Sequence, residues 1–165
     1  MAALDDVNAG PEETVAELLR TCNAAPRFTA EVLAGRPYPD ADALVARAEE
    51  IARALPWDEV ELALAAHPRI GDRVEGASAE AQASRREQSS MTDADDEVRA
   101  ALVEGNLAYE DRFHHVFLIR AAGRSPDEML AELRRRLDNE VGTERAEVTQ
   151  QLAQITALRL KDLLS

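Results

Sequence analysis

Apolar residues recur every three or four positions along most of the chain, which is the period of an α-helix with one buried face. Three such stripes occur before residue 56: Val15, Leu18 and Leu19; then Phe28, Val32 and Leu33; then Leu44, Val45, Ala48, Ile51, Ala52 and Leu55. Gly35 and the two prolines that follow it break the pattern after the second stripe. Asp40 or Asp42 can cap the third. The pattern therefore predicts three helices here.

Prolines and small polar residues delimit the next two helices. Pro56 can start a fourth helix. That helix should end at about His67 and be capped by it, because Pro68 disfavours a helical conformation in the residue before it. A loop over residues 71–78 follows, and Ser78 can cap a fifth helix.

A long helix is expected in the second half of the chain. Thr92 followed by Asp95 resembles a capping box and predicts its start, and the helix should end by Gly123. The run V-F-L-I at 116–119 is open to interpretation as a buried strand. Its setting inside a helical pattern favours helix instead.

Two further helices complete the pattern. Ser125 and Pro126 suit the cap and the first turn of one of them. The last should begin at about Glu140 or Thr143 and reach Leu164. No segment alternates between polar and apolar residues in the way expected of a strand, so the pattern favours a protein built of helices alone.

Composition agrees with this prediction. The 165 residues and 18.1 kDa suit one domain with its own core, and aromatic residues make up only 4% of the chain. Abundant Ala, Leu, Glu and Arg favour helix over sheet. We therefore expect an all-α fold, a single-domain compact bundle of seven to eight helices over residues 1–165, with residues 1–10 flexible.

Charge and cysteine content exclude several classes of partner and site. The formal net charge of −13 would repel nucleic acid and anionic membranes, so neither is expected as a partner. Cys22 is the only cysteine, which excludes an intramolecular disulfide and suits a reducing compartment. The N-terminus lacks the basic and apolar regions of a signal peptide, so a cytoplasmic location is expected.

Candidate chemistry gathers between residues 66 and 88. His67 lies in an H-P-R-I-G turn, where a helix dipole and burial would act on its pKa in opposite directions and leave it close to neutral pH. Ser84, Glu87 and Gln88 are spaced i, i+3 and i+4, which places a hydroxyl, a carboxylate and an amide on one helical face. The plainer interpretation is a turn histidine that bonds a carbonyl, followed by a solvated helix face.

An arginine on an apolar stripe is the second candidate feature. Arg159 continues the +4, +3, +4 spacing that Val148, Leu152 and Ile155 set along the last helix. Its planar guanidinium suits a substrate carboxylate or a ureido carbonyl. Alternatively, it reaches water or bonds the end of a neighbouring helix.

Metal and nucleotide sites are not indicated. His114 and His115 are adjacent, so on a helix they point about 100° apart and cannot easily share one metal ion. The sequence has no H-E-x-x-H motif, no Cys/His cluster, no P-loop and no G-x-G-x-x-G motif. We expect no metal ion and no cofactor.

Five motifs follow one another in register between Ala24 and Leu164. They are H-P-R-I-G, S-R-R-E-Q, N-L-A-Y-E-D-R-F-H-H-V-F-L-I-R-A-A-G-R, L-R-R-R-L-D-N-E and Q-I-T-A-L-R-L. In order and spacing, this set resembles the decarboxylases of 2-oxo-4-hydroxy-4-carboxy-5-ureidoimidazoline (OHCU).

The resemblance implies roles for particular residues. His67 would be the catalytic acid/base, and Glu87 would position it. Ser84, Gln88 and Arg159 would hold the substrate. The other implied substrate-binding positions are Pro68, Arg85, Arg86, Ile119, Arg120, Ala121, Ala122 and Gly123. The family tends to have Gly where this chain has His114, a departure expected to alter local packing but not the chemistry.

The implied function is cofactor-independent, stereoselective decarboxylation of OHCU to (S)-allantoin in urate degradation. The resemblance also implies a homodimer, with urate oxidase and 5-hydroxyisourate hydrolase as pathway neighbours. Two alternatives remain open. One is an enzyme of the same fold that acts on another ureido acid, and the other is a non-catalytic helical adaptor.

Overall fold

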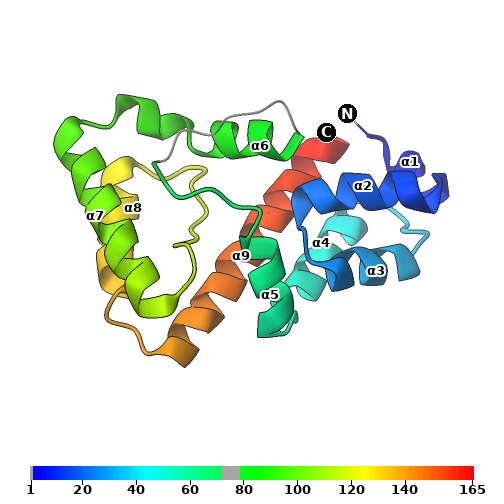
Figure 1. Ribbon diagram of the computed structural model, residues 1–165. Coiled ribbons are helices and arrows are strands. Elements are labelled where there is room, and N and C mark those ends of the chain that lie inside the picture. The colour runs from blue at the N-terminus through cyan, green and yellow to red at the C-terminus, as the bar shows by residue number, and fades with distance from the viewer. Residues whose placement is uncertain (1, 72–78) are drawn as a thin grey trace. The chain divides into compact units, whose positions relative to one another are not determined.

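The computed structural model describes residues 2–71 and 79–165, and every regular element in these two ranges is a helix (Figure 1). The elements are α1 (Leu4–Ala9), α2 (Glu12–Cys22), α3 (Pro26–Ala34), α4 (Ala41–Arg53), α5 (Trp57–Leu64), α6 (Ala79–Glu87), the 3₁₀ helix η1 (Ser89–Asp93), α7 (Asp96–Phe113), α8 (Pro126–Arg136) and α9 (Val141–Leu164). The predicted all-α class is confirmed.

The chain divides into two compact units. Unit 1 comprises residues up to Ala66 together with Thr149–Ser165, and unit 2 comprises His67–Val148. Unit 1 therefore holds α1 to α5 and most of α9, whereas unit 2 holds α6, η1, α7, α8 and the first turns of α9. The single domain expected over residues 1–165 stays a prediction.

The core of unit 1 follows the apolar stripes of the sequence. α2 packs on α3, and α3 packs on α4. Their inward-facing residues are buried: Val15, Leu19, Cys22, Phe28, Val32, Leu44, Ala48, Ile51 and Ala52. Asp40 caps α4 by accepting a hydrogen bond of 2.7 Å from the backbone N–H of Ala43, which confirms one of the two expected caps.

The sequence pattern predicted no helix before residue 11, but Leu4–Ala9 form helix α1, and the flexibility expected for residues 1–10 stays a prediction. Val7 is fully buried, and the Asn8 amide exchanges hydrogen bonds of 2.9 and 2.8 Å with the backbone of Tyr38. Arg36 adds bonds to the carbonyl oxygens of Val7 and Gly10. A helix of six residues is not stable alone, so contacts distant in sequence hold it, and no local pattern could predict it.

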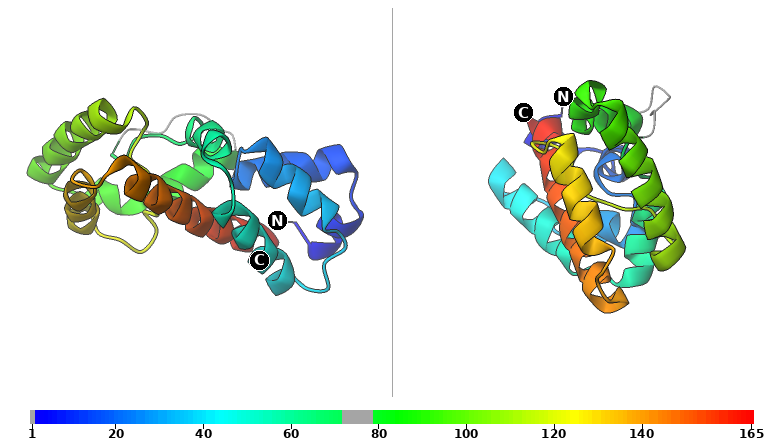
Figure 2. Two further views of the ribbon diagram at one scale, coloured as in Figure 1. Left: turned by 90° about the horizontal axis from the view of Figure 1, so that it is seen from below. Right: turned by 90° about the vertical axis from the view of Figure 1, so that its left-hand side faces the viewer.

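In unit 2, α7 and α8 lie side by side (Figures 1 and 2). A Cβ at Gly105 would come within 2.6 Å of Leu133 Cδ2, so a glycine lets the two helices approach closely. Ser125 and Glu128 form the capping box at the start of α8, which confirms the expected Ser-Pro start.

The expected start of the long helix and the helical interpretation of residues 116–119 were wrong. Asp95, and not Thr92, is the N-cap of α7, because its carboxylate accepts a hydrogen bond of 2.9 Å from the N–H of Val98, while position 92 belongs to η1. The helix stops at Phe113 instead of continuing toward Gly123. Residues 116–119 form neither helix nor strand.

His114 ends α7 in the left-handed conformation, with φ 64° and ψ 28°. Its N–H bonds the carbonyl of Glu110 at 2.8 Å. Glycine occupies such helix ends with least strain, since a Cβ crowds the backbone there. The structure thus gives a physical reason for the glycine that the resembled sequences tend to have at this position.

His114→Gly is therefore expected to stabilise the protein by about 0.5–1 kcal/mol, because relief of strain exceeds the added entropy of the unfolded chain. Urea unfolding measures this change. His114→Ala is the control, since it also removes the ring but keeps the strained Cβ. Equal stability of the glycine and alanine variants would contradict the prediction.

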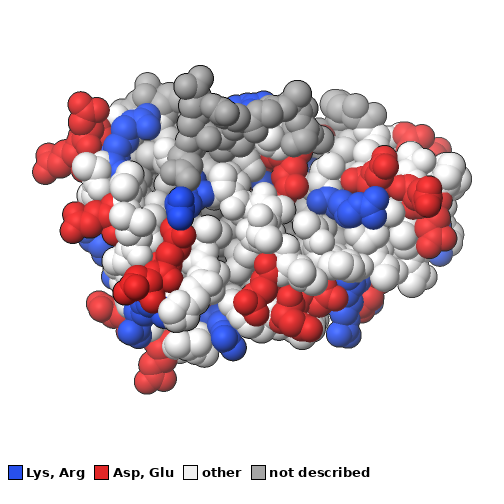
Figure 3. Space-filling model, viewed as in Figure 1, with Lys and Arg blue, Asp and Glu red and all other residues white. Residues whose placement is uncertain are grey.

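Acidic and basic side chains intermingle on the face drawn in Figure 3. Several exposed pairs are in contact, such as Arg27 with Glu31 at 3.1 Å and Arg53 with Glu49 at 2.7 Å. Exposed pairs of this kind contribute little stability. No helix in the described part of the chain is long and apolar enough to cross a membrane.

Candidate active site

His67 and Pro68 are the first residues of unit 2, and both are partly buried. The expectation that His67 caps the preceding helix is wrong. α5 ends at Leu64 with Ala65 as its C-cap, and Ala66 closes a tighter turn by bonding the carbonyl of Ala63 at 3.2 Å.

The three residues after Pro68 are each tied to a helix of unit 2. Arg69 forms a two-pronged ion pair with Glu110 of α7, at 2.7 and 2.8 Å. The Ile70 carbonyl accepts a hydrogen bond of 2.9 Å from the side-chain amide of Asn106, also on α7. The N–H of Gly71 donates to Gln88 Oε1 at 3.0 Å. These contacts fix the chain directly after the His67-Pro68 pair.

Gly71 has φ +92°, a conformation that side-chain-bearing residues rarely adopt, although a Cβ there would meet only Met91 at 3.7 Å. Gly71→Ala is therefore expected to cost about 1–2 kcal/mol of stability through backbone strain, and to lower any activity that depends on His67. Thermal unfolding and an activity assay measure the two effects.

Gly142→Ala is the matched control for that substitution. Gly142 lies in α9, and nothing approaches its Cβ position within 4 Å. Alanine should be neutral there or stabilise by about 0.5–1 kcal/mol. A Gly71→Ala variant as stable and active as Gly142→Ala would show that the turn does not require glycine.

Helix α6 carries the predicted polar face. Ser84 is buried, Glu87 and Gln88 are partly buried, and Arg85 and Arg86 are exposed. Gln88 lies one residue beyond α6, but its N–H bonds the carbonyl of Ser84 at 3.1 Å, so the helical spacing continues through it. The bond from Gly71 to Gln88 brings this helix to the H-P-R-I-G segment. Ser78, the expected cap, lies outside the described residues.

The segment Ile119–Gly123 runs between α7 and α8. Ile119 and Ala121 are buried, whereas Arg120 and Ala122 are partly buried. Its end is tied to η1, because Ser90 Oγ donates to the Arg124 carbonyl at 3.0 Å. The buried side chains of Ile70, Met91, Ile119 and Ala121 belong to one hydrophobic cluster. Unit 2 therefore gathers the H-P-R-I-G segment, the end of α6 and this segment around one core.

A buried ion pair holds the chain just before Ile119. Arg136 Nη2 lies 2.6 Å from Glu144 Oε2, and the two side chains are 2% and 0% exposed. Arg136 Nη1 also donates to the Leu118 carbonyl at 2.8 Å, and its guanidinium lies 4.5 Å from the centre of the Phe117 ring. These contacts explain why residues 116–119 are buried without being helical.

Tyr109 completes this buried cluster from α7. Its hydroxyl donates a hydrogen bond to Glu144. Burial raises the pKa of Tyr109 far above its usual value, and the bond to the Glu144 carboxylate raises it further, so the phenol remains a donor.

The spacing of apolar residues also marks Arg136 as an arginine on a buried face. It follows Met129 and Leu133 at +4 and +3 on a buried stripe, the same spacing that singled out Arg159. An arginine on an apolar stripe therefore identified a buried, paired group in both cases. Tyr109 and Asn106 carry no comparable signal, since polar residues on a long helix are common.

Arg159 is 6% exposed, and the stripe residues Val148, Leu152 and Ile155 are buried as expected. Arg159 Nη1 donates to the carbonyl of Thr21, in the last turn of α2, at 3.2 Å. The interpretation that Arg159 bonds a neighbouring helix end is therefore confirmed for one of its nitrogens. Arg159 belongs to unit 1, while every other predicted site residue belongs to unit 2.

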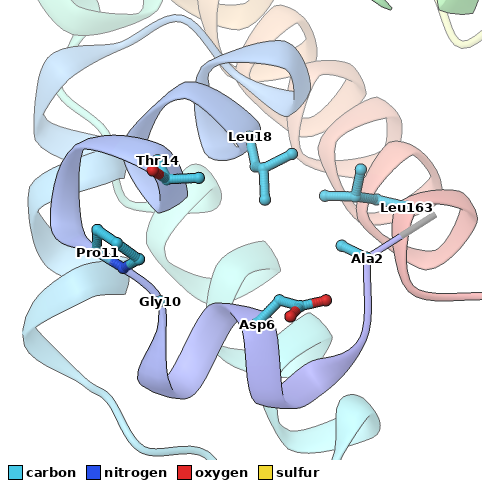
Figure 4. A pocket seen from close by; sticks show the side chains of 7 residues that line it. All are labelled: Ala2, Asp6, Gly10, Pro11, Thr14, Leu18 and Leu163. Carbon is cyan, nitrogen blue, oxygen red and sulfur yellow. The ribbon is translucent and has the colours of Figure 1, made fainter.

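Two other features do not add to the site. A pocket of about 370 Å³ in unit 1 is lined by residues between Ala2 and Leu18 together with Leu163, and none of the predicted residues lies in it (Figure 4). His115 bonds the carbonyl of Val116 at 3.0 Å and stacks edge-on against Tyr109. Among the side chains that the structure describes, no three His, Cys, Asp or Glu are grouped as metal ligands would be.

Comparison with known families shows which family these motifs belong to. The family model described as OHCU decarboxylase matches residues 8–161. The chain belongs to the OHCU decarboxylase family. A member of this family from Amia calva, named 2-oxo-4-hydroxy-4-carboxy-5-ureidoimidazoline decarboxylase, is 31% identical over 156 residues, which cover 92% of this chain and 86% of the relative.

Solved structures show the same fold. An OHCU decarboxylase crystallised in the presence of (S)-allantoin superposes with a TM-score of 0.76 at 24% identity, over 93% of this chain and 98% of that one. An (S)-allantoin synthase gives a TM-score of 0.71 at 18% identity, over 99% of this chain but 54% of that one. The helical arrangement of the family is therefore kept at low identity.

Proposed function

We propose that this protein decarboxylates OHCU stereoselectively to (S)-allantoin and CO₂, in the step of urate degradation that follows hydrolysis of 5-hydroxyisourate. Membership of the family supports the reaction. The hydrogen bond from Gly71 to Gln88 supports the proposed location of the active site, because it brings the H-P-R-I-G and S-R-R-E-Q motifs into contact.

The substrate makes this reaction possible without a cofactor. Its carboxylate is attached to a carbon that also bears a hydroxyl group and adjoins a C=N bond. When the bond to the carboxylate breaks, the electron pair is delocalised into the C=N bond while CO₂ leaves. A proton is then delivered to the former C=N carbon, which bears the ureido group, while the hydroxyl loses its proton and becomes the ring carbonyl. Delivery to one face of that carbon gives the (S) product. The protein needs to orient the carboxylate, handle the hydroxyl proton and control that delivery.

His67 is the acid/base in this proposal. An imidazole changes charge near neutral pH and can both accept and donate a proton. Glu87 positions it, since a carboxylate can orient a ring N–H. The restraints on Arg69, Ile70 and Gly71 support this role, because they limit the conformations open to the preceding His67.

The remaining predicted residues bind the substrate. Gln88 uses its amide oxygen on Gly71, so its NH₂ group is the end that suits a substrate oxygen. Ser84 supplies a hydroxyl. Arg159 is proposed from the family motif alone, as a permanent positive charge that suits a carboxylate. Pro68 and residues 119–123 are proposed to contact the substrate as well, and the exposed Arg85 and Arg86 to add positive potential beside it.

The protein is proposed to act as a cytoplasmic homodimer with no metal ion and no cofactor. The mechanism has no Schiff-base step, and the only lysine, Lys161, is exposed near the end of α9. Urate oxidase and 5-hydroxyisourate hydrolase would supply its substrate. Analytical ultracentrifugation would measure the oligomeric state.

Circular dichroism tests the activity. Urate oxidase and 5-hydroxyisourate hydrolase generate OHCU from urate in the cuvette, and this protein is added. Spontaneous decay leaves racemic allantoin and little lasting signal, whereas the proposed enzyme rapidly gives the signal of (S)-allantoin. An unchanged slow decay would overturn the proposal in favour of another ureido acid or a non-catalytic adaptor, and a substrate panel would separate these two.

A further inference from the structure

Asn106 is a buried amide that none of the predicted site residues includes. It lies on α7 and is 3% exposed. Its Nδ2 donates to the Ile70 carbonyl at 2.9 Å, a bond between positions 36 residues apart in the sequence. Only the NH₂ end of the amide can donate to a carbonyl, so this bond fixes which way the side chain points.

The oxygen end of this amide lowers the stability of the folded state. Asn106 Oδ1 is buried and has no hydrogen-bond partner among the described residues. A buried acceptor without a partner destabilises the folded state, so stability alone does not favour Asn over an apolar residue of similar size. The bond to Ile70 is the contribution that an apolar residue could not replace.

Ile70 is three residues from His67, and little freedom remains between them. Pro68 has its φ angle restricted by its ring. The Arg69 side chain is paired with Glu110, one helical turn after Asn106 on α7, and the Ile70 side chain is buried in the core of unit 2. A shift of the Ile70 carbonyl would therefore be transmitted to the backbone at His67.

We infer that Asn106 is a positioning residue for decarboxylation: by holding the Ile70 carbonyl on α7, it fixes the backbone that presents His67. This inference rests on the proposed function. Asn106 acts through the backbone and does not touch the substrate. A displacement of about 1 Å at a catalytic group can lower a rate about 100-fold, so the bond matters more for turnover than for folding.

The test is the Asn106→Leu variant, with kcat and KM measured on OHCU generated in situ. Leucine removes the donor and the unpartnered acceptor together, so the melting temperature should stay close to that of wild type. We expect kcat to fall about 10- to 100-fold and KM to change less than about threefold. Asn106→Ala removes the same donor without adding bulk, and it replaces Asn106→Leu in these measurements if leucine prevents folding.

Leu133→Val is the matched control. Leu133 is fully buried on α8 in the same core and has no part in the proposed site. The substitution destabilises unit 2 by loss of packing, yet kcat should remain within about twofold of wild type. If Leu133→Val lowered kcat as much as Asn106→Leu, general loosening of the core would explain both, and the inference would fail.

Binding of (S)-allantoin, measured by calorimetry, separates positioning from substrate contact. Asn106→Leu should bind it within about threefold of wild type, whereas a direct contact through Oδ1 would weaken binding and raise KM. Unchanged kcat in both Asn106 variants would overturn the inference while leaving the proposed function intact. If wild type did not accelerate the decay of OHCU, the proposed function would fail, but hydrogen exchange at the Gly71 amide would still test the structural part of the inference. Unchanged protection of this amide from exchange in the Asn106 variants would mean that Asn106 does not hold the segment.

Discussion

His67→Asn is expected to lower kcat for OHCU by about 100- to 10,000-fold, the contribution that general acid/base catalysis typically makes. Asparagine can still form hydrogen bonds, but it cannot exchange a proton near neutral pH. Because His67 is partly buried at the start of a turn and not within a helix, the substitution should leave the melting temperature nearly unchanged. Circular dichroism at several protein concentrations measures the remaining rate.

The matched control is His114→Asn. It makes the same chemical change at an exposed residue, in a left-handed conformation that asparagine tolerates well. Its activity should equal that of wild type. A His67→Asn variant with more than about a tenth of wild-type kcat would assign His67 to orientation of the carboxylate and not to proton transfer.

Arg136→Met is expected to lower the free energy of unfolding by about 3–5 kcal/mol, because it leaves the Glu144 carboxylate buried without its cationic partner. Typical domains have only about 5–15 kcal/mol to lose. The same change removes the donor to the Leu118 carbonyl, so the chain before Ile119 also loses an anchor. Urea unfolding at pH 7 measures the loss.

Two further variants identify the cause of that loss. Arg135→Met removes the adjacent arginine, whose side chain is 52% exposed and pairs with Glu132 and Glu147, and it should cost less than about 1 kcal/mol. Arg136→Met combined with Glu144→Gln removes the buried charge and keeps an acceptor for Tyr109, so it should recover most of the stability. A double variant as unstable as Arg136→Met alone would mean that packing of the guanidinium, and not charge, stabilises this region.

Local sequence pattern predicted the helices that have their own stripes and caps. Asp40 and Ser125 are examples, because a cap acts within three residues of its position. Local pattern failed where distant contacts compete with it. The apolar run at 116–119 fits the interior of a helix, yet His114 ends the helix and Arg136 binds the Leu118 carbonyl of the non-helical chain.

In the candidate site, too, local pattern predicted relations within one helix but not contacts between distant segments. The motif spacing gave Ser84, Glu87 and Gln88 a common helical face, because helical geometry alone sets that relation. It could not show that Gln88 bonds Gly71, or that Asn106 and Glu110 hold the residues after Pro68. These partners lie 17 to 41 positions apart, and the folding of the intervening chain decides whether they meet.

The sequence by itself determined the helical class, the caps at Asp40 and Ser125, the place of Arg159 on an apolar stripe and the motifs of the family. Each of these depends on spacing along one helix or on residue type, which local physics fixes. The tertiary structure alone decided the existence of α1, the non-helical course of residues 116–119, the buried Arg136 and Glu144 pair and the anchor at Asn106. Each of these depends on a polar group whose partner lies outside its own helix. Burial makes such pairing obligatory, but local sequence does not indicate which partner will be found.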